Sequence, residues 1–174
     1  MDLKEDIRLI GDIIETAPLE IPQRPGVYAF WWLGERSVLL SANTEMILVG
    51  PGGKDVEIQF RDWWPSSLAF PCLYVGKTTN LKKRFSQHLK RGSKERLHEI
   101  PESSKKQKAV TTSCQLRYGI EHFFPDEELP LQLISKNVGF SYDVMGADQI
   151  AERFYREDLL IGTWKPWFNV DSER

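Results

Sequence analysis

The chain has 174 residues, the size of one ordinary domain, and a chain of this length can bury a sizeable core. Its composition, with 41% hydrophobic and 28% charged residues, is typical of a soluble globular protein, and no apolar run reaches the roughly 20 residues of a membrane span. The N-terminus is too charged for a signal peptide, so we expect a cytoplasmic protein without a membrane partner.

The first expected element is an amphipathic helix within residues 1–20. Four apolar residues fall on one helical face, namely Leu3, Ile7, Ile10 and Ile14. The helix should end near Thr16, shortly before Pro18, and its expected role is packing.

Short strands are expected next. GVYAFWWL at 26–33 has the aromatic and β-branched composition of a strand, and VLLSA at 38–42 suggests its hairpin partner. MILV at 46–49 and VEIQF at 56–60 predict two further strands, separated by the turn GPGGKD. CLYVG at 72–76 is another strand candidate.

The remainder of the chain mixes helices with strands. Residues 80–91 predict a basic helix, 92–110 a polar, Lys-rich loop, and 147–161 a long helix. CQLRYGI at 114–120 and FSYDVM at 140–145 alternate as strands do, whereas the Pro-interrupted stretch between them carries no assignment. This mixture, without regular βαβ alternation, indicates the α+β class.

Charge is distributed unevenly around a net value of −2. Between Lys77 and Lys108 there are 11 Lys or Arg against 3 Glu, a local charge of +8 that leaves −10 for the other residues. Local Lys and Arg supply most of the affinity for nucleic acid by replacing counterions, so this block is typical of a face that contacts phosphates. A merely solvated loop and helix face is the alternative that charge alone leaves open.

Two simpler kinds of site find little support. The Gly76-Lys77-Thr78 sequence is similar to the end of a nucleotide-binding loop, but Pro71 stands where that loop requires its first glycine, and the residues between are strand formers. Cys72 and Cys114 lie in apolar contexts, which favours buried reduced thiols over a disulfide, and ligands for a zinc site are lacking.

The basic helix directs two functional side chains toward its buried stripe. At 100° per residue, Leu81, Phe85 and Leu89 define that stripe. Arg84 and His88 fall beside it, whereas Lys82 and Lys83 fall away from it. A purely solubilising charge is wasted in such a place, although a structural ion pair or a core histidine would explain the pattern as well.

The long helix places one carboxylate inside its apolar stripe. Ile150, Phe154 and Ile161 mark the stripe, Glu157 lies within it, and Glu152 lies opposite. A buried carboxylate must be protonated, paired with a cation or bound to a metal. Together with Arg84 and His88 it would suit a divalent ion and a phosphodiester, whereas a buried Glu157–Arg84 salt bridge is the simpler alternative.

These residues resemble the motifs of the GIY-YIG nucleases. Gly26-Val27-Tyr28 is similar to the first motif and Tyr74-Val75-Gly76 to the second, which is followed by the helix KTTNLKKRFSQH at 77–88. EDLLIGTWKPWFN at 157–169 looks like the family's C-terminal part. The pieces stand in the family's order and together span most of the chain.

The resemblance implies a small three-stranded antiparallel sheet flanked by helices, and one divalent cation, Mg²⁺ or Mn²⁺, held by Glu157. It assigns catalytic roles to Tyr28, Tyr74, Arg84, His88 and Glu157. Substrate-binding roles fall to Lys77 and Asn169, with Lys82 and Lys83 as further candidates on the outward side of the basic helix.

The proton acceptor stays open between two residues. A free tyrosine has a pKa near 10, so Tyr74 would need adjacent cations such as Lys77 or a phosphate relay, whereas His88 titrates near 6.5 unaided. Tyr28 is expected to orient the water or the phosphate.

The departure from the family pattern is the length between the two tyrosine strands. Tyr28 and Tyr74 are 46 residues apart, so residues 34–70 are an insertion that would hold extra strands or a hairpin. We treat 1–174 as a single nuclease domain, in which any sequence preference comes from the insertions or from a homodimer.

The sequence therefore predicts a metal-dependent endonuclease that hydrolyses phosphodiester bonds, in DNA rather than RNA. The competing hypothesis is a GIY-YIG fold that binds nucleic acid or a protein partner without cutting it. A complete set of site residues, from Tyr28 to Asn169, favours the enzyme.

Overall fold

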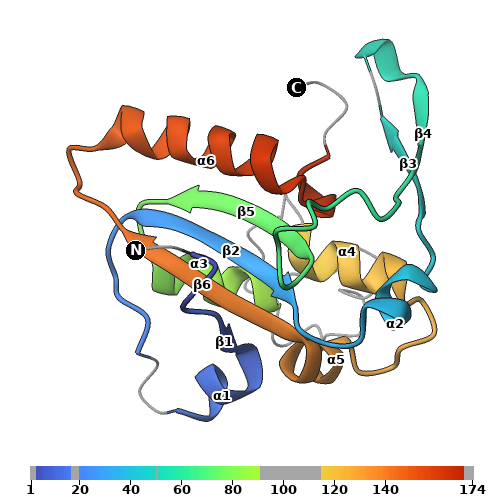
Figure 1. The fold of residues 1–174 in the computed structure, drawn as a ribbon, viewed down its shortest axis with the longest axis horizontal. Helices are drawn as coiled ribbons and strands as arrows, with labels where there is room; N and C mark the ends of the chain where they lie inside the picture. The colour runs from blue at the N-terminus through green and yellow to red at the C-terminus, as the bar shows by residue number, and fades with distance from the viewer. Residues whose placement is uncertain (1–2, 17–19, 50, 91–114, 171–174) are drawn as a thin grey trace, which may run out of the picture.

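The computed structural model describes residues 3–16, 20–49, 51–90 and 115–170 (Figure 1). The strands are β1 (Arg8–Leu9), β2 (Gly26–Trp32), β3 (Glu45–Val49), β4 (Asp55–Gln59), β5 (Cys72–Thr78) and β6 (Val138–Val144). The helices are α1 (Ile10–Glu15), α2 (Arg36–Leu40), α3 (Leu81–Lys90), α4 (Gln115–Phe123), α5 (Pro130–Asn137) and α6 (Ile150–Trp164), with short 3-10 turns at Pro51–Gly53 (η1) and Trp167–Asn169 (η4).

The main sheet is antiparallel and confirms the predicted α+β class. Its order is β1-β6-β2-β5, so the expected three-stranded core of β6, β2 and β5 is present and the two-residue β1 adds a fourth strand at one edge. Every residue of β2 is buried, because helices cover both faces of the sheet: α6 packs on one and α3 on the other (Figure 1). Tyr28 in this central strand lies opposite Gly76 of β5.

Two predictions for the N-terminal part need correction. The helix expected within 1–20 is present and ends at Glu15, close to the predicted end, but it begins only at Ile10, because Arg8 and Leu9 instead pair with Phe140 and Gly139 at the open edge of β6. VLLSA at 38–42 is not the hairpin partner of β2. Residues 36–40 form α2, and the neighbours of β2 are β5 and β6.

The second half also departs from the sequence prediction at one element. Residues 115–123 form a helix where CQLRYGI was expected to be a strand. Leu116, Ile120 and Phe123 are buried, and their spacings of four and three are helical. The unassigned stretch contains α5, and the basic helix, β6 and the long helix are confirmed, although the long helix begins at Ile150.

The insertion at 34–70 has two parts. Its first part contains the predicted hairpin, in which β3 and β4 pair with each other and project away from the main sheet (Figure 1). Its second part joins the core, where the Trp64 ring stacks on Trp167 with centroids 4.4 Å apart. The Trp63 indole donates to Lys165 O at 3.0 Å, and the Trp167 indole donates to Arg61 O at 2.9 Å. The insertion thereby stabilises the position of the C-terminal segment around Lys165 and Trp167.

Two smaller expectations concern cysteine and the membrane. Cys72 is a buried free thiol, as expected, whereas Cys114 and the loop 92–110 lie outside the described residues. Among the helices that the structure describes, none has the length and apolar character needed to cross a bilayer.

The two parts of the insertion should differ sharply in their contribution to stability. We expect Trp64→Ala to lower the free energy of unfolding by about 3–5 kcal/mol, because it removes a buried ring that stacks on Trp167. Ile47→Ala, at a hairpin position that is 63% exposed, should change it by less than about 0.5 kcal/mol. Urea unfolding of both variants is the measurement, and equal effects would contradict this division.

Candidate active site

Four predicted residues gather between the sheet and α3. The hydroxyl of Tyr28 lies 2.9 Å from His88 Nε2, and Arg84 Nε donates to the same hydroxyl at 3.1 Å. The Tyr74 ring lies with its centroid 5.2 Å from that of His88 and 6.1 Å from that of Tyr28. Tyr28 and Tyr74 are close enough for each to shift the pKa of the other. The result is a continuous polar cluster beneath β2 and β5.

Strand alternation and a glycine bring the two tyrosines together. Alternate residues of β5 face α3, which directs Tyr74 and Gly76 to the same side as Tyr28. A Cβ atom on Gly76 would lie 2.5 Å from Tyr28 Oη and 2.8 Å from Tyr74 Cε1. The missing side chain therefore leaves the space in which the Tyr28 hydroxyl lies.

His88 occupies the deepest position of the cluster. Its side chain is 0% exposed, and the Phe30 ring packs against it with centroids 4.9 Å apart. The helical spacing that set His88 and Arg84 beside the buried stripe of α3 is thus observed, with Leu81, Phe85 and Leu89 forming that stripe. Lys82 is half-buried and Lys83 exposed in the first turn of α3, so neither belongs to the buried cluster.

Both tyrosines are held in their protonated form. Burial raises the pKa of Tyr28 well above the ordinary value, Tyr74 adds to the shift, and the charge of Arg84 opposes it. Burial likewise raises the pKa of Tyr74, with Arg84 opposing and the carboxylate of Glu157 reinforcing the shift. Neither phenol is a ready phenolate near neutral pH in this arrangement.

Glu157 lies at the edge of the sheet, across β5 from the tyrosines. Its carboxylate is buried, accepts a hydrogen bond from the Lys77 backbone N–H at 3.1 Å, and pairs with the Lys77 ammonium. Arg84 donates to Tyr28, so the simpler alternative of a structural Glu157–Arg84 pair does not describe the observed contacts of these groups.

Asn169 binds the same edge one step along β5. Its Oδ1 accepts from Val75 N at 2.7 Å, and its Nδ2 donates to Val75 O at 2.8 Å. Because β5 is the outermost strand, Val75 and Lys77 present their backbone groups outward, and side chains take the place of a further strand. The edge of β5 therefore fixes Glu157 and Asn169 relative to the tyrosines on its inner face.

The buried face of α6 differs from the predicted stripe. Glu157 is buried as expected, but it shares that face with Arg153 and Trp164, while Ile150 and Phe154 are more than half exposed. Arg153 was missed by the sequence pattern. Its guanidinium donates to Gly146 O at 2.6 Å, at the turn that leads into the helix.

The candidate site offers a divalent ion such as Mg²⁺ one suitable ligand, the carboxylate of Glu157. Mg²⁺ is commonly held by one or two carboxylates, with water and phosphate oxygens completing its shell, and Glu157 supplies one such carboxylate. The described residues contain no group of three or more His, Cys, Asp or Glu that would hold an ion by themselves. A metal at Glu157 would need the Lys77 ammonium to leave the carboxylate.

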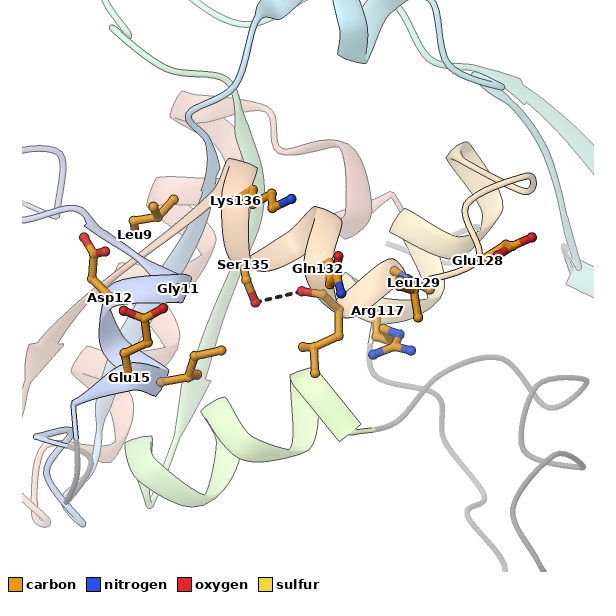
Figure 2. A pocket seen from close by; sticks show the side chains of 13 residues that line it. Leu9, Gly11, Asp12, Glu15, Arg117, Glu128, Leu129, Gln132, Ser135 and Lys136 are labelled. Atoms are coloured by element: carbon orange, nitrogen blue, oxygen red, sulfur yellow. Dashed lines mark hydrogen bonds between the residues drawn. The ribbon is translucent and has the colours of Figure 1, made fainter.

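A separate pocket of about 700 Å³ lies between α1 and α5. Figure 2 shows Asp12 and Glu15 on one side of it and Gln132 and Arg117 on the other. None of the residues that line it is a predicted site residue. The cluster around the two tyrosines is thus a different place in the fold.

The candidate site of this α+β protein thus consists of two tyrosine strands, a helix that carries Arg84 and His88, and a carboxylate across the sheet edge. The family model described as "GIY-YIG catalytic domain" matches residues 67–118, which include β5 and α3. This match covers less than half of the chain, and it supports the resemblance to the GIY-YIG nuclease superfamily that the motifs indicated. No curated protein and no solved structure matched the chain.

Two glycine substitutions, one in the crowded site and one at an open position of a helix, should change the free energy of unfolding in opposite directions. Gly76→Ala should lower the free energy of unfolding by about 1–3 kcal/mol, because its methyl group collides with both tyrosine rings. Gly162→Ala, in α6 with nothing within 4 Å of its Cβ, should raise it by about 0.5–1 kcal/mol. Chemical denaturation measures both, and a neutral Gly76→Ala would show that the tyrosines do not need this space.

Alkaline pH should destabilise the protein through the two tyrosines. Their pKa values are higher in the folded than in the unfolded state, so their contribution is full below about pH 10 and is lost as pH rises through the folded values. Unfolding free energies measured from pH 8 to 11.5 should fall more steeply for wild type than for Tyr28→Phe/Tyr74→Phe. Tyr155→Phe should keep the wild-type slope, and parallel curves for all three would contradict the assignment.

Proposed function

We propose that the protein is a metal-dependent endonuclease that hydrolyses phosphodiester bonds in DNA. The observation that carries the proposal is the Tyr28 hydroxyl, which is hydrogen-bonded to both His88 and Arg84, with the Tyr74 ring packed beside Tyr28 and His88. This cluster lies across β5 from a buried carboxylate. A proton acceptor, a fixed cation and a carboxylate are the groups that phosphodiester hydrolysis requires.

Tyr28, which is hydrogen-bonded to His88 and packed beside Tyr74, would join the two candidate proton acceptors into one path. His88 is completely buried and needs an intermediary to reach water, whereas Tyr74 is the less buried of the two tyrosines. A proton leaving water can move to Tyr74 as that hydroxyl passes its own proton to Tyr28, which passes one to His88 Nε2. His88 ends as the imidazolium, so neither tyrosine has to persist as a phenolate despite its raised pKa.

This path sets a requirement on hydrogen-bond direction. The Tyr28 oxygen accepts from Arg84 Nε, and its single proton must be donated to His88 Nε2, which has to be the unprotonated nitrogen. The water oxygen then forms its bond to phosphorus as the bond to the leaving oxygen breaks, and Arg84 stabilises the added negative charge.

Glu157 would hold the divalent ion, which when bound neutralises the scissile phosphate and assists the leaving oxygen. Lys77 would exchange its carboxylate partner for a phosphate oxygen, because its ammonium is a point charge on a flexible stem. Lys82 and Lys83 would contact phosphates farther along the strand. Asn169 would hold β5 in place through Val75.

One observation favours the second candidate, a non-catalytic nucleic-acid or protein-binding module. The carboxylate that would receive the metal is already neutralised by Lys77. If this ion pair persists in the presence of Mg²⁺ and DNA, the same fold would bind phosphates without cutting.

Cleavage of supercoiled plasmid with Mg²⁺, Mn²⁺ or EDTA separates the two candidates. We expect Glu157→Gln to lose at least about 100-fold in cutting rate because the metal loses its carboxylate, and Tyr28→Phe about 100-fold or more because the proton path is broken. Glu152→Gln, an exposed carboxylate of the same helix, should cut like wild type.

Binding is measured in parallel with fluorescent DNA and RNA oligonucleotides. A wild type that binds DNA but cuts nothing with any metal supports the binding module. Cutting by Glu157→Gln at the wild-type rate would show that the metal is not held here. Equal cleavage of RNA and DNA would overturn the choice of DNA.

A further inference from the structure

The side of α6 that borders the site carries an exposed aromatic ring. Phe154 is 52% exposed, and Ile150, four residues earlier on the same side, is 58% exposed. Scattered surface apolar residues are ordinary, but this ring is tied to the site by a specific contact. The Lys77 ammonium lies 3.9 Å from the Phe154 ring centroid and at the same time pairs with Glu157.

One cation therefore links the ring to Glu157, the carboxylate that would hold the metal in the proposed function. A ring so near a phosphate site is within reach of the base that belongs to the neighbouring nucleotide. The surroundings suit a nucleic acid strand, because Lys77 attracts its phosphates while Phe154 and Ile150 offer an apolar surface.

We propose that Phe154, supported by Ile150, is a stacking platform for the nucleobase next to the scissile phosphate. The inference rests on the proposed function and narrows its substrate. A base inside an intact duplex is already stacked on its neighbours, so the ring can only receive a base that is unpaired or turned out of the helix. The substrate is thus DNA with a single-stranded, mismatched or bulged nucleotide at the cut.

The competing explanation is structural. Phe154 could serve only to cover the Lys77–Glu157 pair, since a cation over an aromatic face is itself stabilising. The two explanations differ in one respect: a cover acts on every substrate equally, whereas a platform acts only where a base is present.

The test uses full-length protein in EDTA, so that binding is measured without cutting. Single-stranded DNA oligonucleotides carry the fluorescent base 2-aminopurine at successive positions, and stacking on a ring quenches its fluorescence. Wild type should quench one position more than the rest. A second oligonucleotide has an abasic site at that position.

We expect Phe154→Ala to weaken binding of the intact oligonucleotide about 10-fold and to abolish the quenching. It should leave affinity for the abasic oligonucleotide within about twofold of wild type. Phe154→Tyr should restore stacking, and Tyr155→Ala, which removes a 75% exposed ring on the outward side of the same helix, should behave as wild type.

The outcomes separate this inference from the proposed function. Absence of quenching by wild type, or an equal loss on intact and abasic oligonucleotides, would overturn the platform even if the protein cuts plasmid. Quenching that depends on Phe154 in a protein that cuts nothing would support the platform and overturn the catalytic proposal.

Discussion

The close approach of Tyr28 to the backbone of Gly76 is the contact on which the whole site depends. Cross-strand pairing sets the two residues opposite each other, and only a residue without a side chain leaves room for the tyrosine hydroxyl there. That hydroxyl reaches His88 and Arg84 across the interface with α3. The register of β2 against β5 therefore determines the geometry of the candidate site, because a shift by one residue would turn Tyr28 to the opposite face.

The edge of β5 organises the other half of the site. An exposed edge strand leaves backbone donors and acceptors unsatisfied and invites pairing with other chains. Here Asn169 binds Val75 and Glu157 binds Lys77, so two candidate site residues also satisfy backbone groups of the strand. The tryptophans of the insertion stabilise the segment that delivers Asn169, since Trp63 and Trp64 bind Lys165 and Trp167. An insertion far from the chemistry in sequence thus supports the position of a site residue.

The sequence predicted the structure correctly wherever a residue pattern was compatible with only one arrangement of the chain. The stripe of α3 predicted the inward His88 correctly. For Glu157, the cost of burying an unpaired carboxylate left protonation, a cation partner or a metal open, and the structure shows a cation partner. The pattern could not tell which cation this would be, because Lys77 belongs to β5 and Arg84 to the helix that follows it, and only the contacts at the sheet edge show that Lys77 is the partner. Periodicity failed at Leu116 and Ile120, because a spacing of four fits a strand and a helix equally. The burial of Phe123, three residues after Ile120, fits only the helix. Periodicity failed again at Arg8 and Leu9, where the open edge of β6 outweighed local helical preference.

The exposed side of α6 is where the sequence pattern and the observed structure differ. The amphipathic pattern counted Ile150 and Phe154 as core, yet the buried face of the helix is occupied by Arg153, Glu157 and Trp164. A helix that buries its charges and exposes part of its apolar surface reverses the usual arrangement, and such reversals are concentrated at functional sites. The charges are buried because they bind backbone groups of β5 and of the turn at Gly146. Ile150 and Phe154 beside them stay exposed and are available to a ligand. A base stacked on Phe154 would bury the apolar surface that the protein itself leaves exposed to water.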